Sequence, residues 1–117
     1  MNISKDLVAA SATPLVLAIL NEGESYGYAI QKRVRELSGG ELEWADGMLY
    51  PLLHRMERNG YIEASWGKSE TGRRRKYYRL NDRGRKELAS QKHQWQVVNS
   101  TLRGIRLASV DMAPQKI

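Results

Sequence analysis

The sequence predicts a mainly α-helical protein with a small β-hairpin wing: a winged helix-turn-helix followed by a long C-terminal helix. Three observations support this fold class. Apolar residues recur at helical spacing through the first half of the chain, and the segment after Asn59-Gly60 alternates as two strands do. Beyond Leu80, apolar residues repeat every seven positions. At 117 residues the chain is long enough for one modest core.

The first helix has two possible starts. Thr13-Pro14 resembles an N-cap followed by proline at the first helical position, which predicts a buried helix over Leu15–Leu20. Alternatively, one helix runs from Ser4 and is kinked at Pro14. The sequence leaves both open.

Ser25 is the expected cap of the second helix, and Ser38-Gly39-Gly40 is its expected end. Its predicted buried face consists of Tyr26, Ile30, Val34 and Leu37. The short stretch from Glu41 to Trp44 predicts an extended segment beside the wing.

The third helix is expected to be capped by Asp46 and to end at the Asn59-Gly60 turn. Its predicted buried edge is Leu49, Leu53 and Met56, with Leu52 alongside. A second, polar edge is predicted to face outward and comprises Gly47, Tyr50, Pro51, His54, Arg55 and Arg58.

The wing follows directly. Tyr61 to Trp66 alternates, with Ile62, Ala64 and Trp66 predicted on the half-buried side. Gly67 to Gly72 is the expected turn, and Arg73 to Leu80 is the returning strand.

Asn81 or Asp82 is expected to cap a last helix that runs to about Leu107, before a frayed tail at Ala113–Ile117. Such a helix would be roughly 39 Å long. One side of it, the heptad seam, repeats every seven residues and consists of Leu88, Gln91, Trp95, Val98, Leu102 and Ile105. A seam of this length predicts pairing with a second copy in a two-fold dimer. Packing on its own domain is the alternative.

Charge is concentrated in the second half of the chain. Residues 1–60 carry 6 Lys/Arg and 8 Asp/Glu, whereas residues 61–117 carry 13 and 5, within a net charge of +6. This clustering favours an anionic partner. The chain lacks cysteine, has no cluster of metal-ligand spacing, no glycine-rich phosphate loop and no apolar run of membrane-spanning length. We therefore expect no enzyme activity, no metal, no cofactor, no membrane partner and a cytoplasmic location.

The wing and third helix together predict double-stranded DNA as the partner. A helix fits the major groove, so Tyr50, His54, Arg55 and Arg58 can reach base edges or phosphates. The wing contributes phosphate-binding cations and a candidate for minor-groove insertion, Arg74; these cations are Lys68, Arg73, Arg74, Arg75 and Lys76. The alternatives are a solvated helix face and a solubilising basic patch.

Trp95 also has two interpretations. An aromatic residue at helical spacing is typical of core or interface packing. Alternatively, two Trp95 rings from paired subunits line a cavity for a flat aromatic effector, which would control DNA binding.

These motifs resemble the PadR family of bacterial transcriptional regulators. The resemblance rests on residues 47–60 (GMLYPLLHRMERNG), Trp66, residues 72–80 (GRRRKYYRL), Gly84 and the Tyr26-Gly27-Tyr28 motif, and it covers the chain from about Ser4 to Leu107. It implies a winged-helix homodimer that binds a palindromic operator and usually represses. The single C-terminal helix resembles the subgroup with a minimal dimerisation region. Some relatives in the family release DNA on binding phenolic compounds or drugs.

The resemblance also implies site residues. Gly47, Met48, Tyr50 and Pro51 match the DNA-facing start of the family's recognition helix, Tyr26 matches its second helix, and Gly72 to Lys76 match its wing. The family commonly has proline at the position of Arg74, which implies a more basic and more mobile wing here. In some ligand-binding relatives an aromatic residue occupies the Trp95 position.

We therefore expect a dimeric DNA-binding regulator, most simply a repressor, with a winged-helix DNA-binding region at residues 1–80. Residues 81–117 would form the dimerisation helix and tail. The first alternative is a sensor controlled by an aromatic ligand or drug at Trp95. The second is a winged-helix module for protein contacts with no DNA role.

Overall fold

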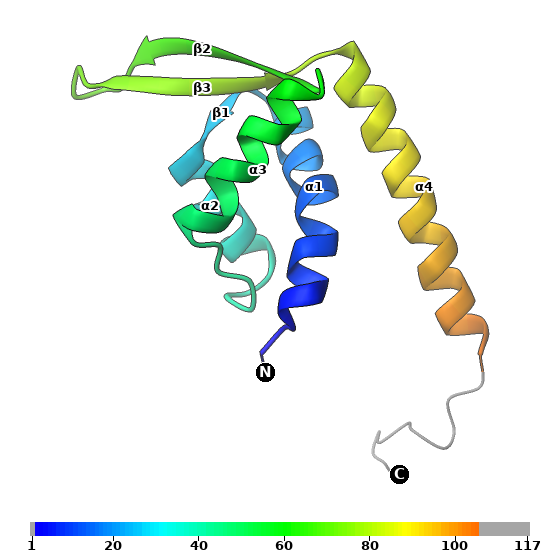
Figure 1. The fold of residues 1–117 in the computed structure, drawn as a ribbon. Coiled ribbons are helices and arrows are strands. Elements are labelled where there is room, and N and C mark those ends of the chain that lie inside the picture. Colours follow the sequence, from blue (N-terminus) through cyan, green and yellow to red (C-terminus); the bar gives the residue numbers. More distant parts are fainter. Residues whose placement is uncertain (1, 106–117) are drawn as a thin grey trace.

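The computed structural model describes residues 2–105. The elements follow the order α1 (Lys5–Glu22), β1 (Ser25–Tyr26), α2 (Gly27–Leu37), α3 (Asp46–Arg58), β2 (Ile62–Lys68), β3 (Arg74–Leu80) and α4 (Asp82–Gly104). The three strands form one antiparallel sheet in the order β1-β3-β2 (Figure 1). The predicted fold class, mainly helical with a small wing, is confirmed.

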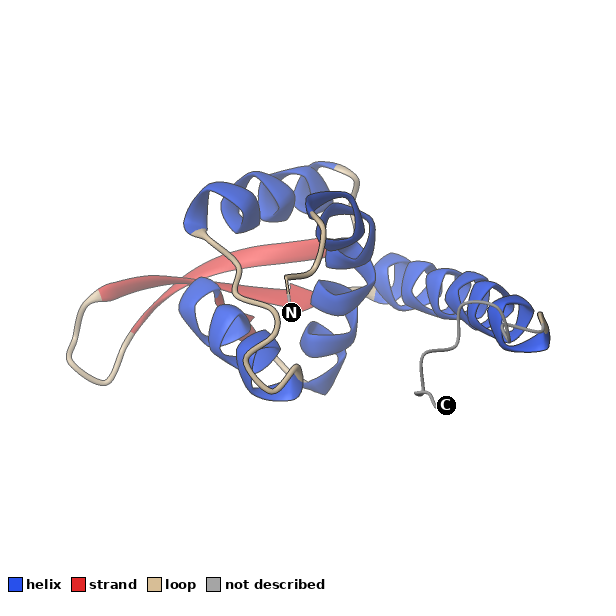
Figure 2. Cartoon of the chain, turned by 90° about the horizontal axis from the view of Figure 1, so that it is seen from below, coloured by secondary structure: helices blue, strands red, loops and turns tan. Residues whose placement is uncertain are grey.

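The first three helices pack under one part of the sheet, and two segments project from this body. The tip of the β2–β3 hairpin extends past α2 and α3, while α4 leaves on the opposite side (Figures 1 and 2). The core lies between α1, α2, α3 and the root of the hairpin, and its most buried members include Val16, Leu17, Ile30, Leu49, Leu53, Met56, Ile62 and Tyr78. The hairpin tip and α4 therefore lie outside the core.

Helix α1 is continuous through Pro14. It begins one residue after Ser4, whose hydroxyl accepts a hydrogen bond from the backbone N–H of Leu7 at 3.2 Å. Ser4 thus satisfies one of the free N–H groups at the helix start. Of the two starts that the sequence left open, the long helix is observed, and Thr13 is not a cap.

The segment at Ser25 and Tyr26 is a strand, which corrects the prediction of a cap and first turn there. It pairs with β3, Ser25 opposite Tyr78 and Tyr26 opposite Tyr77. Tyr26 is the residue before α2, and its side chain makes no capping hydrogen bond. On α2, Ile30 and Val34 are buried as predicted, whereas Leu37 is 60% exposed.

No strand forms at Glu41–Trp44, so the predicted extended segment beside the wing is wrong. This segment is a loop whose Trp44 side chain enters the core. Gln31 of α2 fixes its end, because its Nε2 donates to the carbonyl oxygen of Trp44 at 3.0 Å and to Oδ1 of Asp46 at 2.8 Å. The edge position of the sheet is taken by β1 instead.

Helix α3 begins at Asp46, one residue earlier than predicted, because Ala45 occupies the N-cap position. Leu49, Leu52, Leu53 and Met56 are buried, as the helical spacing predicted. The helix ends at Arg58 and the chain turns at Asn59-Gly60.

The hairpin strands differ from the prediction at their ends: β2 begins at Ile62 and continues to Lys68, and β3 begins at Arg74, one residue later than predicted. Arg73 therefore lies in the turn. Ile62 is buried and Ala64 half-buried, but Trp66 on the same side is 59% exposed. The alternation therefore predicted the correct side for these three residues. Trp66, the third of them, lies beyond the edge of the core, so the prediction of a half-buried Trp66 is wrong.

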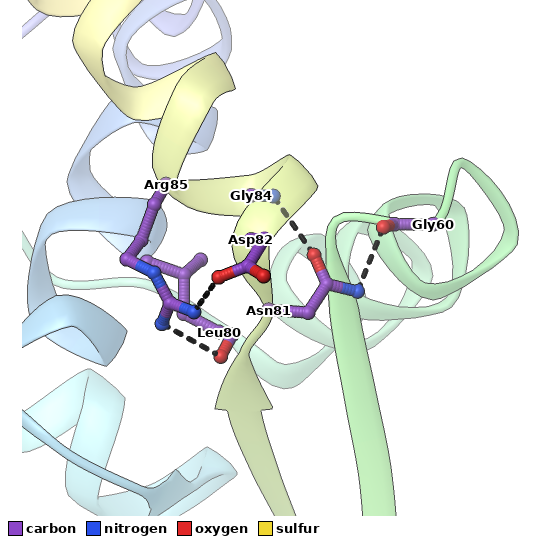
Figure 3. Close-up of polar contacts among 6 residues, drawn as sticks. All are labelled: Gly60, Leu80, Asn81, Asp82, Gly84 and Arg85. Carbon is purple, nitrogen blue, oxygen red and sulfur yellow. Dashed lines mark hydrogen bonds and ion pairs between the residues drawn. The ribbon is translucent and has the colours of Figure 1, made fainter.

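A small network fixes the start of α4 (Figure 3). The Asn81 side chain accepts from the Gly84 N–H at 2.8 Å and donates to the Gly60 carbonyl at 2.8 Å. Gly84 is itself buried, and a Cβ there would overlap the Tyr61 carbonyl oxygen and the Leu80 side chain. Arg85 pairs with Asp82 and also reaches the Leu80 carbonyl. These contacts join α4 to the root of the hairpin.

Helix α4 ends at Gly104, and Ile105 is its C-cap. The predicted continuation to Leu107 and the predicted tail at Ala113–Ile117 lie outside the described residues.

Candidate nucleic-acid interface

The outward face of α3 carries the predicted polar edge. Gly47, Tyr50, Pro51, His54, Arg55 and Arg58 are all exposed, whereas Met48 is half-buried and packs against the core. The amphipathic pattern of α3 explains this division, since its leucines and Met56 occupy the opposite face. The face offers donors from Tyr50, His54 and the arginines on a surface of about 13 helical residues.

Tyr50 on this face is positioned by Gly27, the first residue of α2. A Cβ at Gly27 would lie 2.7 Å from Cζ of Tyr50 and closer still to its hydroxyl oxygen. Glycine at this position therefore lets the Tyr50 ring lie directly over the start of α2. The start of α2 and the exposed face of α3 consequently form one surface.

Lys76 connects the wing to α3. Its Nζ lies 3.5 Å from Oε1 of Glu57, and both side chains are partly exposed. Because β-strand residues alternate between faces, Lys76 shares a face with the buried Tyr78 and Leu80. Lys76 is thus directed toward the helices and is partly neutralised by an acidic neighbour.

Arg75 lies on the other face of the sheet. Its Cζ is 3.8 Å from the ring centroid of Tyr26 and 5.9 Å from that of Tyr77, and these two rings meet edge to face at 5.7 Å. Tyr26 is therefore half-buried under Arg75. This arrangement anchors β1 to β3 through side chains as well as through the backbone.

Arg74 and Arg73 are the exposed cations at the wing tip, with Lys68 opposite Arg74 in the register. Cζ of Arg74 lies 4.6 Å from the ring centroid of Trp66. The turn between the strands is closed by the backbone N–H of Ser69, which donates to the Arg73 carbonyl at 2.8 Å. The consecutive cations are therefore not equivalent: Arg74 and Arg75 lie over aromatic rings, whereas Lys76 faces a carboxylate.

A cleft of about 580 Å³ joins α3 to the wing, and its walls are mainly aromatic and basic. Its lining residues come from β1, α2, α3 and both hairpin strands: Tyr26, Gly27, Tyr28, Tyr50, His54, Trp66, Arg75, Lys76 and Tyr78. Burial raises the pKa of the Tyr78 hydroxyl, with further contributions from Glu57 and Tyr50. Tyr78 therefore stays neutral and can donate a hydrogen bond at neutral pH.

The heptad seam on α4 is largely exposed. Trp95 is 37% exposed, Val98 58% and Leu102 53%, while Leu88 packs partly against the core and Gln91 donates to Glu87 at 2.7 Å. Ile105, at the C-cap, is also exposed. Between α1 and α4 lies a groove of about 660 Å³, lined on the α4 side by Leu88, Lys92, Trp95, Gln96 and Asn99.

A comparison with known protein families shows which family has this combination of elements. The model of the PadR-like family of transcriptional regulators matches residues 16–90. The chain belongs to the PadR family. This confirms the resemblance seen in the sequence, and it agrees with the observed winged-helix fold.

Solved structures support the same assignment. A transcriptional regulator from Clostridium thermocellum is 31% identical, with a TM-score of 0.79 over 89% of this chain and 99% of that one. A PadR-like regulator from Bacillus cereus is 28% identical, with a TM-score of 0.74 over 85% of this chain and 94% of that one. An uncharacterized protein of Lysinibacillus sphaericus is 25% identical over 86% of this chain and 92% of its own length.

PadR proteins are transcriptional regulators and not enzymes. Within residues 2–105, no cluster of three His, Asp or Glu side chains is arranged to hold a metal ion. In the same range, every helix is too short or too polar to cross a bilayer.

The structure brings together in one cleft five of the thirteen residues that the sequence assigned to DNA binding. Tyr26, Tyr50, His54, Arg75 and Lys76 line one cleft, whereas Lys68, Arg73 and Arg74 lie at the wing tip. Trp66, Tyr28 and Tyr78 also line the cleft and were not predicted. The sequence did contain a signal for Trp66. The alternating pattern of β2 continues beyond the residues that the small core can cover, and an aromatic residue at the end of such a pattern is expected to be exposed. The greater mobility expected of the wing stays a prediction.

Proposed function

We propose that this PadR regulator binds a palindromic DNA operator as a homodimer and represses transcription. The observation that carries the proposal is the cleft between α3 and the wing, where donors from both elements share one face. In this proposal residues 1–80 form the DNA-binding region and residues 81–117 the dimerisation helix and tail. A regulator of this kind works in the cytoplasm, where the chromosome lies.

Base recognition is assigned to α3. Its exposed face presents Tyr50, His54, Arg55 and Arg58, and a single helix of this kind fits the major groove. Pro51 has a compact side chain in the second turn of α3. In the first turn, Gly47 has no side chain and Met48 packs against the core instead of facing outward. DNA can therefore approach this turn closely.

Affinity is assigned to the wing. Lys68, Arg73 and Arg74 are exposed, and Arg75 and Lys76 line the adjoining cleft. Each phosphate that such a cation neutralises releases counterions, so the affinity depends on salt and little on sequence. Tyr26 lies beneath Arg75 and supports it.

Dimerisation is assigned to the heptad seam. Exposed Trp95, Val98, Leu102 and Ile105 form an apolar stripe along α4 that the rest of the described chain does not cover. The same stripe on a second copy covers it with two-fold symmetry, and this symmetry matches a palindromic site. Leu88 and Gln91 extend the seam toward the DNA-binding region.

The decisive experiment is selection of bound duplexes from a random pool. We expect an inverted repeat whose half-sites are separated by about one helical turn of DNA or a multiple of it. A single unpaired half-site would contradict the dimer, and no enrichment at low salt would contradict DNA binding altogether. In that second case a protein-interaction module becomes the better interpretation.

A second candidate, an effector-responsive repressor, is favoured by the groove of about 660 Å³ beside Trp95. A flat aromatic compound or drug would stack on Trp95 in this groove and change the relation of α1 to α4. We expect saturating ligand to quench Trp95 fluorescence and to weaken operator binding. An operator affinity that stays constant at saturation would exclude this control.

A further inference from the structure

We propose that Trp66 is a positioning residue for DNA binding. Its indole ring holds the guanidinium of Arg74 on the α3 side of the wing, with the charge and the edge of the guanidinium available to a phosphate. This inference rests on the DNA-binding function proposed above and deepens it, since it says which wing cation is presented to the duplex and by what means.

The strand register places the two side chains on the same face. Trp66 is opposite Lys76, and Arg74 is opposite Lys68, so Trp66 and Arg74 are diagonal neighbours across the β2–β3 ladder. Diagonal neighbours lie within reach of long and aromatic side chains. The observed 4.6 Å between Cζ of Arg74 and the ring centroid is a cation–π distance. Buried Tyr78 and Leu80 mark this as the face that packs on the helices.

Packing does not account for Trp66. Its side chain is 59% exposed, and Ala64, two residues earlier on the same face, is the last residue of β2 that packs against the core. A large apolar ring at such a position is exposed without any gain to the core. Its contacts are instead with Arg74 and with the wall of the cleft that joins the wing to α3.

The partners of the neighbouring cations differ in kind. Lys76 faces the carboxylate of Glu57 at 3.5 Å, which partly neutralises its charge. Arg75 lies on the Tyr26 ring, on the opposite face of the sheet. Arg74 has an uncharged partner, since Cζ of its guanidinium lies 4.6 Å from the centroid of the Trp66 ring. The N–H donors along its edge stay available for bidentate binding to a phosphate, and its full charge is kept.

Holding Arg74 in this way also lowers the entropic cost of binding. A free arginine side chain at a hairpin tip has many rotamers, and ordering it on DNA consumes part of the interaction energy. The Trp66 ring restricts Arg74 before DNA arrives. From the strength of exposed cation–π contacts, we expect loss of the ring to weaken duplex binding by about 2- to 5-fold.

The test is a double-mutant cycle on the full chain. Four variants and the wild-type chain are titrated with a random-sequence duplex over a range of salt concentrations. The variants are Trp66→Ala, Trp66→Phe, Arg74→Ala and the double variant Trp66→Ala/Arg74→Ala. Leu37→Ala is the matched control, because Leu37 is equally exposed but lies at the far end of α2. Thermal unfolding of each variant shows that the fold is kept. In the free protein, the ring-current shift of the Arg74 side-chain protons reports the stack directly.

We expect Trp66→Ala to lose the ring-current shift and to weaken binding, and Trp66→Phe to restore part of both. Arg74→Ala should lower the salt slope by about one phosphate contact, and the double variant should bind no worse than Arg74→Ala alone. Additive losses in the double variant would overturn the positioning role while leaving DNA binding intact. Absence of duplex binding by the wild-type chain at low salt would overturn the proposed function as well.

Discussion

Lys76 on β3 and Glu57 on α3 lie 3.5 Å apart, and this ion pair connects the wing to α3. It places a negative charge within the surface that is proposed to meet DNA. Partly exposed ion pairs contribute little to stability, typically below about 1 kcal/mol. Its larger consequence is for binding, because Glu57 competes with phosphate for Lys76.

Removing this carboxylate should therefore strengthen DNA binding. We expect Glu57→Gln to tighten binding to any duplex and to raise the salt slope by about one contact, because Lys76 is released. The melting temperature should change by only a few degrees. Filter binding at several salt concentrations measures both quantities. Glu63→Gln is the matched control, since Glu63 pairs with Arg79 instead; an equal gain in that variant would point to net charge alone.

The wing tip and α3 should differ in what they contribute. Arg73→Ala and Arg74→Ala are expected to weaken binding to all sequences, each lowering the salt slope by about one. Arg79→Ala removes the same charge from a paired residue of β3 and serves as the control. Normal binding by both tip variants would refute the role of the wing.

Substitutions on α3 should instead relax sequence preference. We expect Tyr50→Ala and Arg55→Ala to reduce the ratio of operator to random-duplex affinity, by about 1–3 kcal/mol for a residue that contacts a base. Competition titration with the selected operator and a scrambled duplex measures this ratio. If both affinities fall together, the residue contacts the DNA backbone and not a base.

The contact between Gly27 and Tyr50 predicts a specific rescue. Gly27→Ala forces the Tyr50 ring to move, because the new Cβ would lie 2.7 Å from Cζ of Tyr50. Overpacking of this kind costs about 1–3 kcal/mol. We expect denaturant unfolding to show this loss in Gly27→Ala, and the Gly27→Ala/Tyr50→Ala chain to be no less stable than Tyr50→Ala. A persistent loss in the double variant would place the strain in the backbone of α2.

The seam should control the oligomeric state. Val98 is 58% exposed, so Val98→Asp should leave the fold of one chain intact while preventing pairing through α4. Sedimentation should then show a monomer, and operator binding should weaken because the two half-sites no longer act together. Ser100→Glu, on the opposite side of α4 by helical spacing, is the control. A dimeric Val98→Asp chain would mean that another surface pairs.

The start of α4 should be sensitive to acid. Arg85, through its hydrogen bond and its charge, holds the pKa of Asp82 below its ordinary value. The folded chain therefore binds fewer protons at Asp82 than the unfolded chain, and this contribution to stability is lost as the pH falls below about 4. We expect Arg85→Gln to flatten the decline of melting temperature with acid. An unchanged profile would show that Asp82 titrates independently of Arg85.

The periodicity of the sequence was sufficient to predict elements and their buried faces wherever these depend on local contacts. The spacing of Leu49, Leu53 and Met56 placed the buried edge of α3 correctly, and the alternation from Ile62 placed the hairpin. The family motifs at residues 47–60 and 72–80 were recognised from the same stretch. Where two local signals conflicted, as at Pro14, the sequence could not decide, since proline is favoured at a helix start and is disfavoured, but not excluded, within a helix.

Composition and motif thus determined the class of this protein: a basic, mainly helical PadR regulator with a wing and a long terminal helix. The tertiary structure decided how its charges and rings are used. It placed Lys76 against Glu57, Arg75 on Tyr26 and Arg74 on exposed Trp66, and it recruited Ser25 and Tyr26 as the third strand. These pairings join residues that lie on different helices or strands. They depend on strand register and on where the core ends, and neither is encoded in the local pattern of any one segment.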